Sequence, residues 1–348
     1  MTGHDESLIY PLADGTMLNG QYVIQQVLGA GGFGITYLAL DIERNIYVVI
    51  KECLPSAYAH RDANNWIRAH SPELETMFIQ CIRNAKHEAE TIAKINHPGV
   101  VRVYNLFDAN GTFYYVMECI EGVTLHDQIE TFRTEGKLFT VEQANNLLVQ
   151  LLDILQYLHT QNVFHCDIKP GNIFLQKDGT PKLIDFGAVR SKELQHQGLI
   201  QITPGYTPPE FYPGRRAEIG PWCDIYGLGA TFYELVSGMI PDPADQRSVV
   251  DRTKKMTSFL PLRKLYSTSF LAGIDKALAP DIKERFNSAQ AWYNYISTVQ
   301  SGAQLRTTAP MRTTMGGATY RPKKSGNGAL FVILLILSIG IAAYLLFK

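Results

Sequence analysis

The sequence HCDIKPGN, at residues 165–172, is followed at residues 185–187 by DFG, and the two segments together carry the strongest signal in the chain. Their side chains include oxygen donors and a cation: Asp167, Asn172, Asp185 and Lys169. Phosphoryl transfer needs a carboxylate near the attacking hydroxyl, a cation near the moving phosphate, and oxygen ligands for a divalent metal. One aspartate in a loop is more often a turn former, and DFG alone means little. The order and spacing of both segments therefore favour phosphoryl chemistry.

A glycine-rich segment lies between two strand-like runs near the N-terminus. It reads Gly29-Ala30-Gly31-Gly32-Phe33-Gly34, with Leu28 before it and the run ITYLA after it. Glycines let backbone N–H groups approach phosphate oxygens, but the same spacing opens dinucleotide-binding folds, in which a helix follows. Because a strand-like run follows here, a dinucleotide fold is disfavoured. A plain glycine-rich hairpin turn stays open as an alternative for this segment alone.

Lys51 ends a further strand-like run, VVIK. Its ammonium could extend to water along an apolar surface. Turned inward, it needs an anion such as a nucleotide phosphate and a carboxylate that holds it. Residues 75–95 carry apolar side chains at three- and four-residue steps, which predicts a helix with one apolar face. Glu88 lies on that face and Glu90 on the polar side, so Glu88 is favoured over Glu90 as the partner of Lys51.

With these motifs in this order, about residues 22–296 resemble the protein kinase superfamily, and more narrowly a bacterial, eukaryotic-like Ser/Thr protein kinase. The resemblance implies an α+β, two-lobed fold. The small lobe is expected to be an antiparallel β-sheet with one main helix, and the larger lobe to be mostly helical. Lysine at position 169 is typical of Ser/Thr rather than tyrosine kinases, so the expected substrates are Ser/Thr hydroxyls of proteins, the chain's own included.

The resemblance also implies roles for the motif residues. Asp167 is the expected catalytic base, with Lys169 and Lys51 as the other catalytic residues. The residues expected at the nucleotide are Leu28, Gly29, Ala30, Gly31, Gly32, Phe33, Gly34, Lys51, Glu88, Glu118, Cys119, Ile120, Asn172 and Asp185. Asn172 and Asp185 are also the expected metal ligands. The expected cofactors are ATP and Mg²⁺, with Mn²⁺ as an alternative.

Later motifs favour a protein substrate. TPGYTPPE, at residues 203–210, resembles the end of an activation segment, which kinases of small molecules lack. Asp224 resembles the start of the buried helix that anchors the catalytic loop, and Arg285 resembles the arginine that pairs with Glu210. A catalytically inactive, membrane-tethered binding module is the main rival. It predicts loss of Lys51, Asp167 or Asp185, and all three are present.

Two departures from the family pattern bear on regulation. Cys166 stands where many kinases have the arginine that binds a phosphorylated activation loop, which suggests activity without loop phosphorylation or control through another element. Residues 53–83 are longer than the usual connection and begin near a KExLP pattern typical of one bacterial subgroup. This insertion is either a regulatory or partner surface or a packed surface element.

Composition excludes some classes of protein. Of 348 residues, 32 are Lys or Arg and 33 are Asp or Glu, so a net charge of -1 gives no basic field for nucleic acid. The 5 cysteines form no CxxC pair, which favours a reducing compartment over a disulfide framework or zinc site. No secretory signal begins the sequence.

The C-terminal part predicts attachment to a membrane. Residues 329–347 carry no charge, and at about 1.5 Å per residue they would span roughly 28 Å, near the thickness of a bilayer core. A buried core helix is the alternative. Arginines and lysines precede this run, so the positive-inside rule places the kinase domain in the cytoplasm, at the inner membrane.

The domain organisation expected from these observations has an N-terminal extension, a kinase domain, a flexible tether and a membrane helix. Their respective bounds are 1–17, 18–300, 301–328 and 329–347, with the small lobe at about 18–121 and the large lobe at about 122–300. The resemblance is also compatible with a homodimer of the kinase domain.

Overall fold

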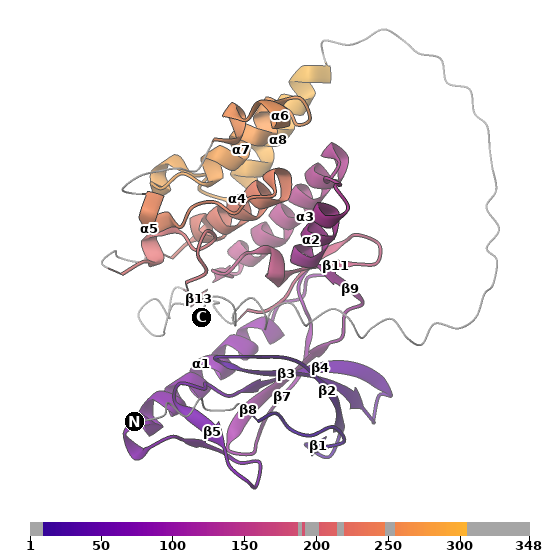
Figure 1. Cartoon of the computed structure of the whole chain (residues 1–348), viewed down its shortest axis with the longest axis vertical. Helices are drawn as coiled ribbons and strands as arrows, with labels where there is room; N and C mark the ends of the chain where they lie inside the picture. Colours follow the sequence, from indigo (N-terminus) through magenta and orange to yellow (C-terminus); the bar gives the residue numbers. More distant parts are fainter. Residues whose placement is uncertain (1–9, 187–189, 192–201, 214–218, 248–254, 305–348) are drawn as a thin grey trace, which may run out of the picture.

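The strand-like runs of the N-terminal part form one antiparallel sheet in the order β1-β2-β3-β4-β8-β7 (Figure 1). The computed structural model describes residues 10–186, 190–191, 202–213, 219–247 and 255–304. The strands of this sheet are β1 (Met17–Leu18), β2 (Tyr22–Gly31), β3 (Gly34–Asp41), β4 (Ile46–Cys53), β7 (Val103–Ala109) and β8 (Thr112–Glu118). Buried residues alternate along β3 because successive side chains face opposite sides of the sheet. Gly31 pairs with Gly34, so the glycine-rich segment is the tip of a hairpin.

The one long helix of the small lobe is α1 (Glu75–Ala93), which packs on β4, β7 and β8. Its predicted apolar face is confirmed. Phe78, Ala89 and Ile92 are buried, and Ile82 and Ala85 pack against the core of this lobe. This face orients the helix, and so determines which of its polar residues turn towards β4.

The insertion is a packed part of the small lobe. It forms the hairpin of β5 (Ala59–Arg61) and β6 (Ile67–Ala69), followed by the 3-10 helix η1 (Pro72–Leu74). The Ile67 N–H donates to the carbonyl of Asn110 (2.8 Å), next to Gly111. Gly111 has φ +73°, and a Cβ there would lie 2.4 Å from Nε1 of Trp66. The hairpin therefore sits directly on the turn between β7 and β8, where a side chain on Gly111 would displace it.

The larger lobe is mostly helical, as the resemblance implies (Figure 1). Its helices are α2 (Leu125–Thr134), α3 (Val141–Thr160), α4 (Pro221–Ser237), α5 (Ala244–Arg247), α6 (Leu260–Arg263), α7 (Thr268–Ala277) and α8 (Ala289–Gln304). Short 3-10 helices lie between them: η2 (Pro170–Asn172), η4 (Pro209–Phe211), η5 (Met256–Ser258) and η6 (Ile282–Glu284). Short strands that the sequence did not predict are β9 (Gly122–Thr124), β10 (Val163–Phe164), β11 (Ile173–Gln176), β12 (Pro181–Leu183) and β13 (Arg190–Ser191).

The helix α4 has no solvent-facing side over most of its length. Every residue from Cys223 to Val236 is buried. Two glycines let neighbouring segments approach its backbone: a Cβ on Gly227 would lie 2.6 Å from the carbonyl oxygen of Ile168, and one on Gly229 would lie 2.8 Å from Cβ of Ala277. The helix α4 therefore contacts both the catalytic loop and α7 closely.

The C-terminal part corrects one predicted boundary. The helix α8 continues to Gln304 and includes residues 301–304, which the sequence assigned to the tether. The sequence prediction placed the boundary where large apolar side chains end, but a helix can continue past the last residue that packs on the core. Within the part of the chain that the structure describes, no helix is long and apolar enough to cross a membrane. The predicted span, residues 329–347, lies outside the described residues.

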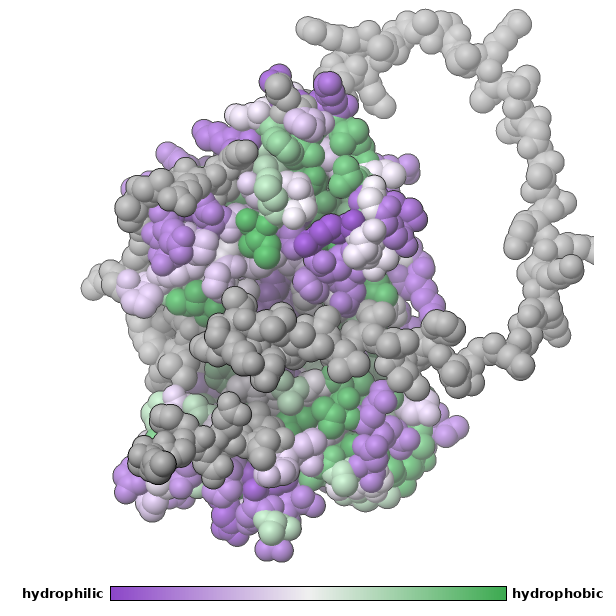
Figure 2. Space-filling model, viewed as in Figure 1, coloured by the Kyte–Doolittle hydropathy of each residue, from purple (hydrophilic) through white to green (hydrophobic). Residues whose placement is uncertain are grey.

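Apolar side chains form a core inside each lobe. The core of the small lobe includes Ile24, Tyr37 and Ile50, and that of the large lobe includes Leu151 and Phe232. Figure 2 shows hydrophilic residues spread over both lobes on the face in view, with apolar residues in separate, smaller areas. Such a mixed surface is ordinary for a globular protein with an internal core.

Candidate active site

The segment HCDIKPGN forms a loop that is fastened to α4. The Asp224 carboxylate, fully buried, accepts hydrogen bonds from the backbone N–H groups of His165 (3.0 Å) and Cys166 (2.7 Å). Nε2 of His159 lies 2.8 Å from the same carboxylate. Cys166 has φ 62°, in the left-handed region. The predicted anchoring by Asp224 is confirmed, and it fixes the backbone just before Asp167.

The carboxylate of Asp167 is surrounded by polar groups that hold it. Asn172 donates from Nδ2 to its backbone carbonyl (2.9 Å) and to Oδ2 (2.8 Å). Lys169 Nζ lies 2.8 Å from Oδ2, and the Thr203 hydroxyl donates to Oδ1 (3.2 Å). The Asp167 side chain is 11% exposed, so these contacts act in a partly shielded site. The structure thus brings Asp167, Lys169 and Asn172 together.

Thr203 is a member of this cluster that the sequence did not single out. Besides its bond to Asp167, its Oγ1 accepts a hydrogen bond from Lys169 Nζ (3.2 Å). Thr203 opens the TPGYTPPE segment, and that position is the one signal of its role in the sequence. Its contact with Asp167 links two segments that are far apart along the chain.

Lys51 forms an ion pair with the aspartate of the DFG motif. Its Nζ lies 2.5 Å from Oδ1 of Asp185, whose backbone is left-handed at φ 53°. The charge of Lys51 lowers the pKa of Asp185 to about 2. The carboxylate therefore stays ionised at neutral pH, and the pair would be lost only as pH falls through that value. The Asp185 side chain is 47% exposed, so solvent screens the pair.

Glu88 also acts on Lys51. Burial works against the charge of this lysine, but the carboxylates of Asp185 and Glu88 and the Tyr115 side chain hold its pKa well above the usual value. Glu90 is exposed on the other side of α1. Of Glu88 and Glu90, Glu88 is therefore the one that α1 places near enough to act on the charge of Lys51, as the sequence pattern indicates.

The glycine loop forms the tip of the β2–β3 hairpin. Ala30, Gly31, Gly32 and Phe33 are exposed, and Leu28, Gly29 and Gly34 are partly buried. A Cβ on Gly34 would lie 2.0 Å from the carbonyl oxygen of Glu52, so the close approach of β3 and β4 requires glycine there. Nothing lies within 4 Å of a Cβ added at Gly31 or Gly32. The tip therefore leaves room for a ligand against its backbone.

Glu118, Cys119 and Ile120, which were expected at the nucleotide, lie where the chain passes from β8 to β9 between the lobes. Glu118 Oε1 accepts from the Arg102 N–H (2.7 Å) and from Lys182 Nζ (2.7 Å). Burial raises the pKa of the half-buried Cys119 thiol. Ile120 packs against the core of the large lobe. The side chain of Glu118 is therefore committed to protein contacts, and Cys119 and Ile120 line the connection between the two lobes.

The end of the activation segment is fastened by a buried ion pair. Arg285 donates from Nη1 to Oε1 of Glu210 (2.8 Å) and from Nη2 to Oε2 (3.0 Å). It also donates to the carbonyls of Ala279 (2.6 Å) and Pro280 (3.0 Å), and its guanidinium lies over the ring of Tyr226. The predicted pairing of Glu210 with Arg285 is confirmed. Both side chains are almost fully buried, so each depends on the other for its charge.

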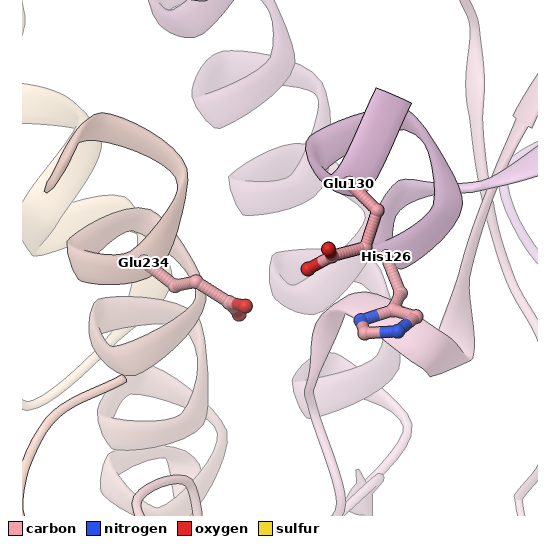
Figure 3. A group of neighbouring side chains, drawn as sticks. All are labelled: His126, Glu130 and Glu234. Atoms are coloured by element: carbon pink, nitrogen blue, oxygen red, sulfur yellow. The ribbon is translucent and has the colours of Figure 1, made fainter. Parts of the chain in front are cut away.

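Three further side chains meet between α2 and α4. Figure 3 shows His126 and Glu130 on α2 and Glu234 on α4 with their polar ends towards one another, and among the described residues they could hold a metal ion on geometry. Both carboxylates already have protein partners: Tyr206 donates to Glu234, and Arg133 donates to Glu130. Burial raises the pKa of Glu234. Glu234 therefore serves to hold Tyr206 of the activation segment.

Comparison with known proteins agrees with this geometry. A family model described as the protein kinase domain matches residues 22–295. Serine/threonine-protein kinase PrkC of Bacillus subtilis is 30% identical over 283 residues, covering 79% of this chain and 40% of that protein. Serine/threonine-protein kinase B of Synechocystis is 30% identical over 325 residues, covering 88% of this chain and 51% of that protein.

A solved structure described as PpkA-294 apo form superposes on the chain with a TM-score of 0.71 and 30% identity. The match covers 82% of this chain and 99% of the chain in that solved structure. The chain spans about half the length of the curated relatives it matches. Since the family model covers most of the sequence and the two lobes have the expected architecture, the chain belongs to the protein kinase family.

Proposed function

We propose that the chain is an ATP-dependent Ser/Thr protein kinase, which transfers the γ-phosphoryl group of ATP to hydroxyls of proteins, including its own. The observation that carries the proposal is the cluster of Lys169, Asn172 and Thr203 around the Asp167 carboxylate, beside a loop anchored by Asp224. The relatives named as Ser/Thr protein kinases support the choice of hydroxyl.

Each residue of the cluster has a distinct task in this reaction. Asp167 accepts the proton of the attacking hydroxyl, and Thr203 and Asn172 keep its carboxylate oriented. Lys169, beside that carboxylate, places a positive charge where the phosphoryl group moves. Lys51 binds phosphate oxygens of the nucleotide under the glycine loop. Thr203 connects the activation segment, which would contact the protein substrate, to the catalytic base Asp167.

Asn172 and Asp185 fit a divalent metal by the chemistry of their donors. Asp185 offers an ionised, half-exposed carboxylate. The amide nitrogen of Asn172 is turned to Asp167, which leaves its oxygen on the other side of the amide. Oxygen donors of this kind suit Mg²⁺, with Mn²⁺ as an alternative. A divalent ion held by these residues would supply positive charge to the phosphates of the nucleotide.

Phosphate transfer by the full chain tests the proposal. Incubation with radiolabelled ATP and Mg²⁺, with and without a generic Ser/Thr substrate, is expected to give phosphoserine and phosphothreonine in the chain and in the substrate. EDTA is expected to remove the signal because the reaction would lose the positive charge that a divalent ion supplies to the phosphates. Phosphotyrosine alone, or no label in either protein while nucleotide binds, would contradict the proposed function.

We also propose that residues 329–347 anchor the kinase domain to the cytoplasmic face of the inner membrane through the tether that follows α8. The uncharged run and the basic residues before it support this proposal. The full chain is expected in the membrane pellet after alkaline extraction, and a chain ending at residue 328 in the soluble fraction. Equal distribution of the two chains would contradict the anchor. A homodimer stays a prediction from the family resemblance.

A further inference from the structure

The insertion begins with a contact to the glycine loop. The N–H of Leu54 donates to the carbonyl of Phe33 (3.1 Å), and the N–H of Ser56 donates to the carbonyl of Gly32 (3.0 Å). The Ser56 hydroxyl lies 3.4 Å from the same carbonyl of Gly32. Leu54 and Ser56 are called the loop clamp below. They tie the exposed tip of the loop to the chain segment that leaves β4.

The loop clamp is itself held by the hairpin that follows it. The carbonyl of Pro55 accepts from the N–H groups of Tyr58 (2.9 Å) and Ala59 (3.0 Å), which closes a tight turn. His70, just after β6, approaches the carbonyl of Ser56 through Nε2 (2.9 Å). Ala59 is buried in the core of the small lobe, and this packing holds the turn in place. The position of the clamp therefore depends on the β5–β6 hairpin.

A buried ion pair fastens that hairpin to the central strand β4. Glu52, directly after Lys51, is 0% exposed, and the guanidinium of Arg61 in β5 donates to its carboxylate. Tyr37 of β3 donates to the same carboxylate (2.8 Å), as does Tyr114 of β8. Burial and the nearby charge of Glu52 raise the pKa of Tyr37, so its hydroxyl stays protonated and able to donate. Glu52 therefore has a donor from each of three strands.

The remaining donors of Arg61 close the cluster. Nε donates to the carbonyl of Tyr10 (2.7 Å) and Nη1 to the carbonyl of Asn65 (3.1 Å). The N–H of Leu12 donates to the Tyr37 hydroxyl (3.1 Å). The pair thus joins the N-terminal segment, the hairpin and the sheet at one point. A buried guanidinium with several fixed acceptors holds its backbone closely.

We infer that the insertion is a positioning device for the nucleotide: the Glu52–Arg61 pair fixes the β5–β6 hairpin, and the loop clamp holds the glycine loop in place for the phosphates of ATP. This inference rests on the proposed kinase function. Lys51 and Glu52 are neighbours in β4 whose side chains face opposite sides of the sheet. One strand therefore carries the phosphate-binding lysine on one face and the anchor of the clamp on the other. A loop that is already held loses less conformational entropy when ATP binds.

The sharpest test removes the contacts of Ser56 with Gly32 and leaves the side chains of the Glu52–Arg61 cluster untouched. Ser56→Pro deletes the N–H that donates to Gly32, and the fixed φ of proline suits the first position of the turn that Pro55 opens. Ser56→Ala keeps that N–H and is the matched control. In the full chain, Ser56→Pro is expected to raise the Kd for Mg-ATP and KM for ATP about 3- to 10-fold, the size of one hydrogen bond. The kcat and the KM for the protein substrate should stay within about twofold. Ser56→Ala loses only the long hydroxyl contact to Gly32 (3.4 Å), so its Kd for Mg-ATP should rise less than that of Ser56→Pro.

A second variant tests the route from the ion pair to the clamp. The double change Glu52→Gln with Arg61→Met removes both charges together, so neither is left buried alone. It is expected to raise the Kd for Mg-ATP, as Ser56→Pro does. Combined with Ser56→Pro, it should add little further loss, because both changes act on the same contact. Full additivity of the two effects in a folded protein would overturn the proposed route.

The two proposals fail in different ways. If Ser56→Pro keeps the wild-type melting temperature and binds Mg-ATP as the wild type does, the clamp has no positioning role, whatever the chain phosphorylates. If the wild type binds Mg-ATP but transfers no phosphate, the kinase function fails, and the Kd values of the variants still decide the role of the clamp.

Discussion

Replacing Asp167 by asparagine is expected to lower kcat about 10²- to 10⁴-fold, the usual contribution of a general base. Asparagine has the same shape and can still accept from the Thr203 hydroxyl, which lies 3.2 Å from Oδ1 in the native site. It cannot take a proton from the attacking hydroxyl. The KM for ATP should stay within about threefold, since Lys51 and Asp185 form a separate pair.

Asp153→Asn supplies the matched control for this change. Asp153 lies on α3 with 79% of its side chain exposed, and its Oδ2 lies 3.5 Å from Nε2 of His97. Steady-state kinetics on the same Ser/Thr substrate should give a kcat for Asp153→Asn near the wild-type value. The kcat of Asp167→Asn should be lower by the expected 10²- to 10⁴-fold. An Asp167→Asn protein that kept a tenth or more of wild-type kcat would show that another group takes the proton.

Replacing Arg285 by methionine is expected to destabilise the large lobe by about 3–5 kcal/mol, the cost of leaving one partner of a buried ion pair alone. Glu210 would keep one weak donor, the thiol of Cys223, 3.7 Å from Oε1. The carbonyls of Ala279 and Pro280 would lose their donors as well. Methionine retains much of the apolar stem, so the loss reports on charge and hydrogen bonding rather than on volume.

Urea unfolding followed by circular dichroism measures this effect, with Lys283→Met as the control. Lys283 is an exposed basic residue in the 3-10 helix η6, which ends just before Arg285, so its loss should cost less than about 0.5 kcal/mol. Equal unfolding midpoints for Arg285→Met and Lys283→Met would contradict a structural role for the Glu210–Arg285 pair.

The sequence predicted those parts of the site in which the partners share a motif or a periodic face. Asp167 and Asn172 were assigned to one site because they lie in one short motif, and the structure shows them in contact. The apolar face of α1 distinguished Glu88 from Glu90 because helical periodicity fixes which side each residue takes. The strand-like run after the glycine loop argued against a dinucleotide-binding fold, and that run is β3, which pairs with β2.

Other contacts had no signal that a single sequence could show. Glu52 follows Lys51 and reads as an ordinary strand residue, and Arg61 lies in a strand too short to show a period. Their pairing arises because the hairpin folds back over the sheet, which no local pattern encodes. The contact between Lys51 and Asp185 likewise depends on how the two lobes meet.

Cys166 illustrates how a departure from the family pattern is accommodated. Its thiol lies in an apolar cluster with Phe164, Phe211 and Ile219, and its backbone N–H is held by Asp224. The position is therefore packed rather than charged. This packing agrees with the hypothesis that control, where it exists, acts through an element other than a cation at position 166.

The burial of α4 on every side also has a consequence for biosynthesis. A helix without a polar face gains its stability from neighbours, and each of its two glycines costs about 1 kcal/mol relative to alanine. It becomes stable once the catalytic loop and α7 have closed around it. The large lobe should therefore form in one cooperative step, and the catalytic loop, though synthesised early, stays unorganised on the ribosome until α7 has emerged.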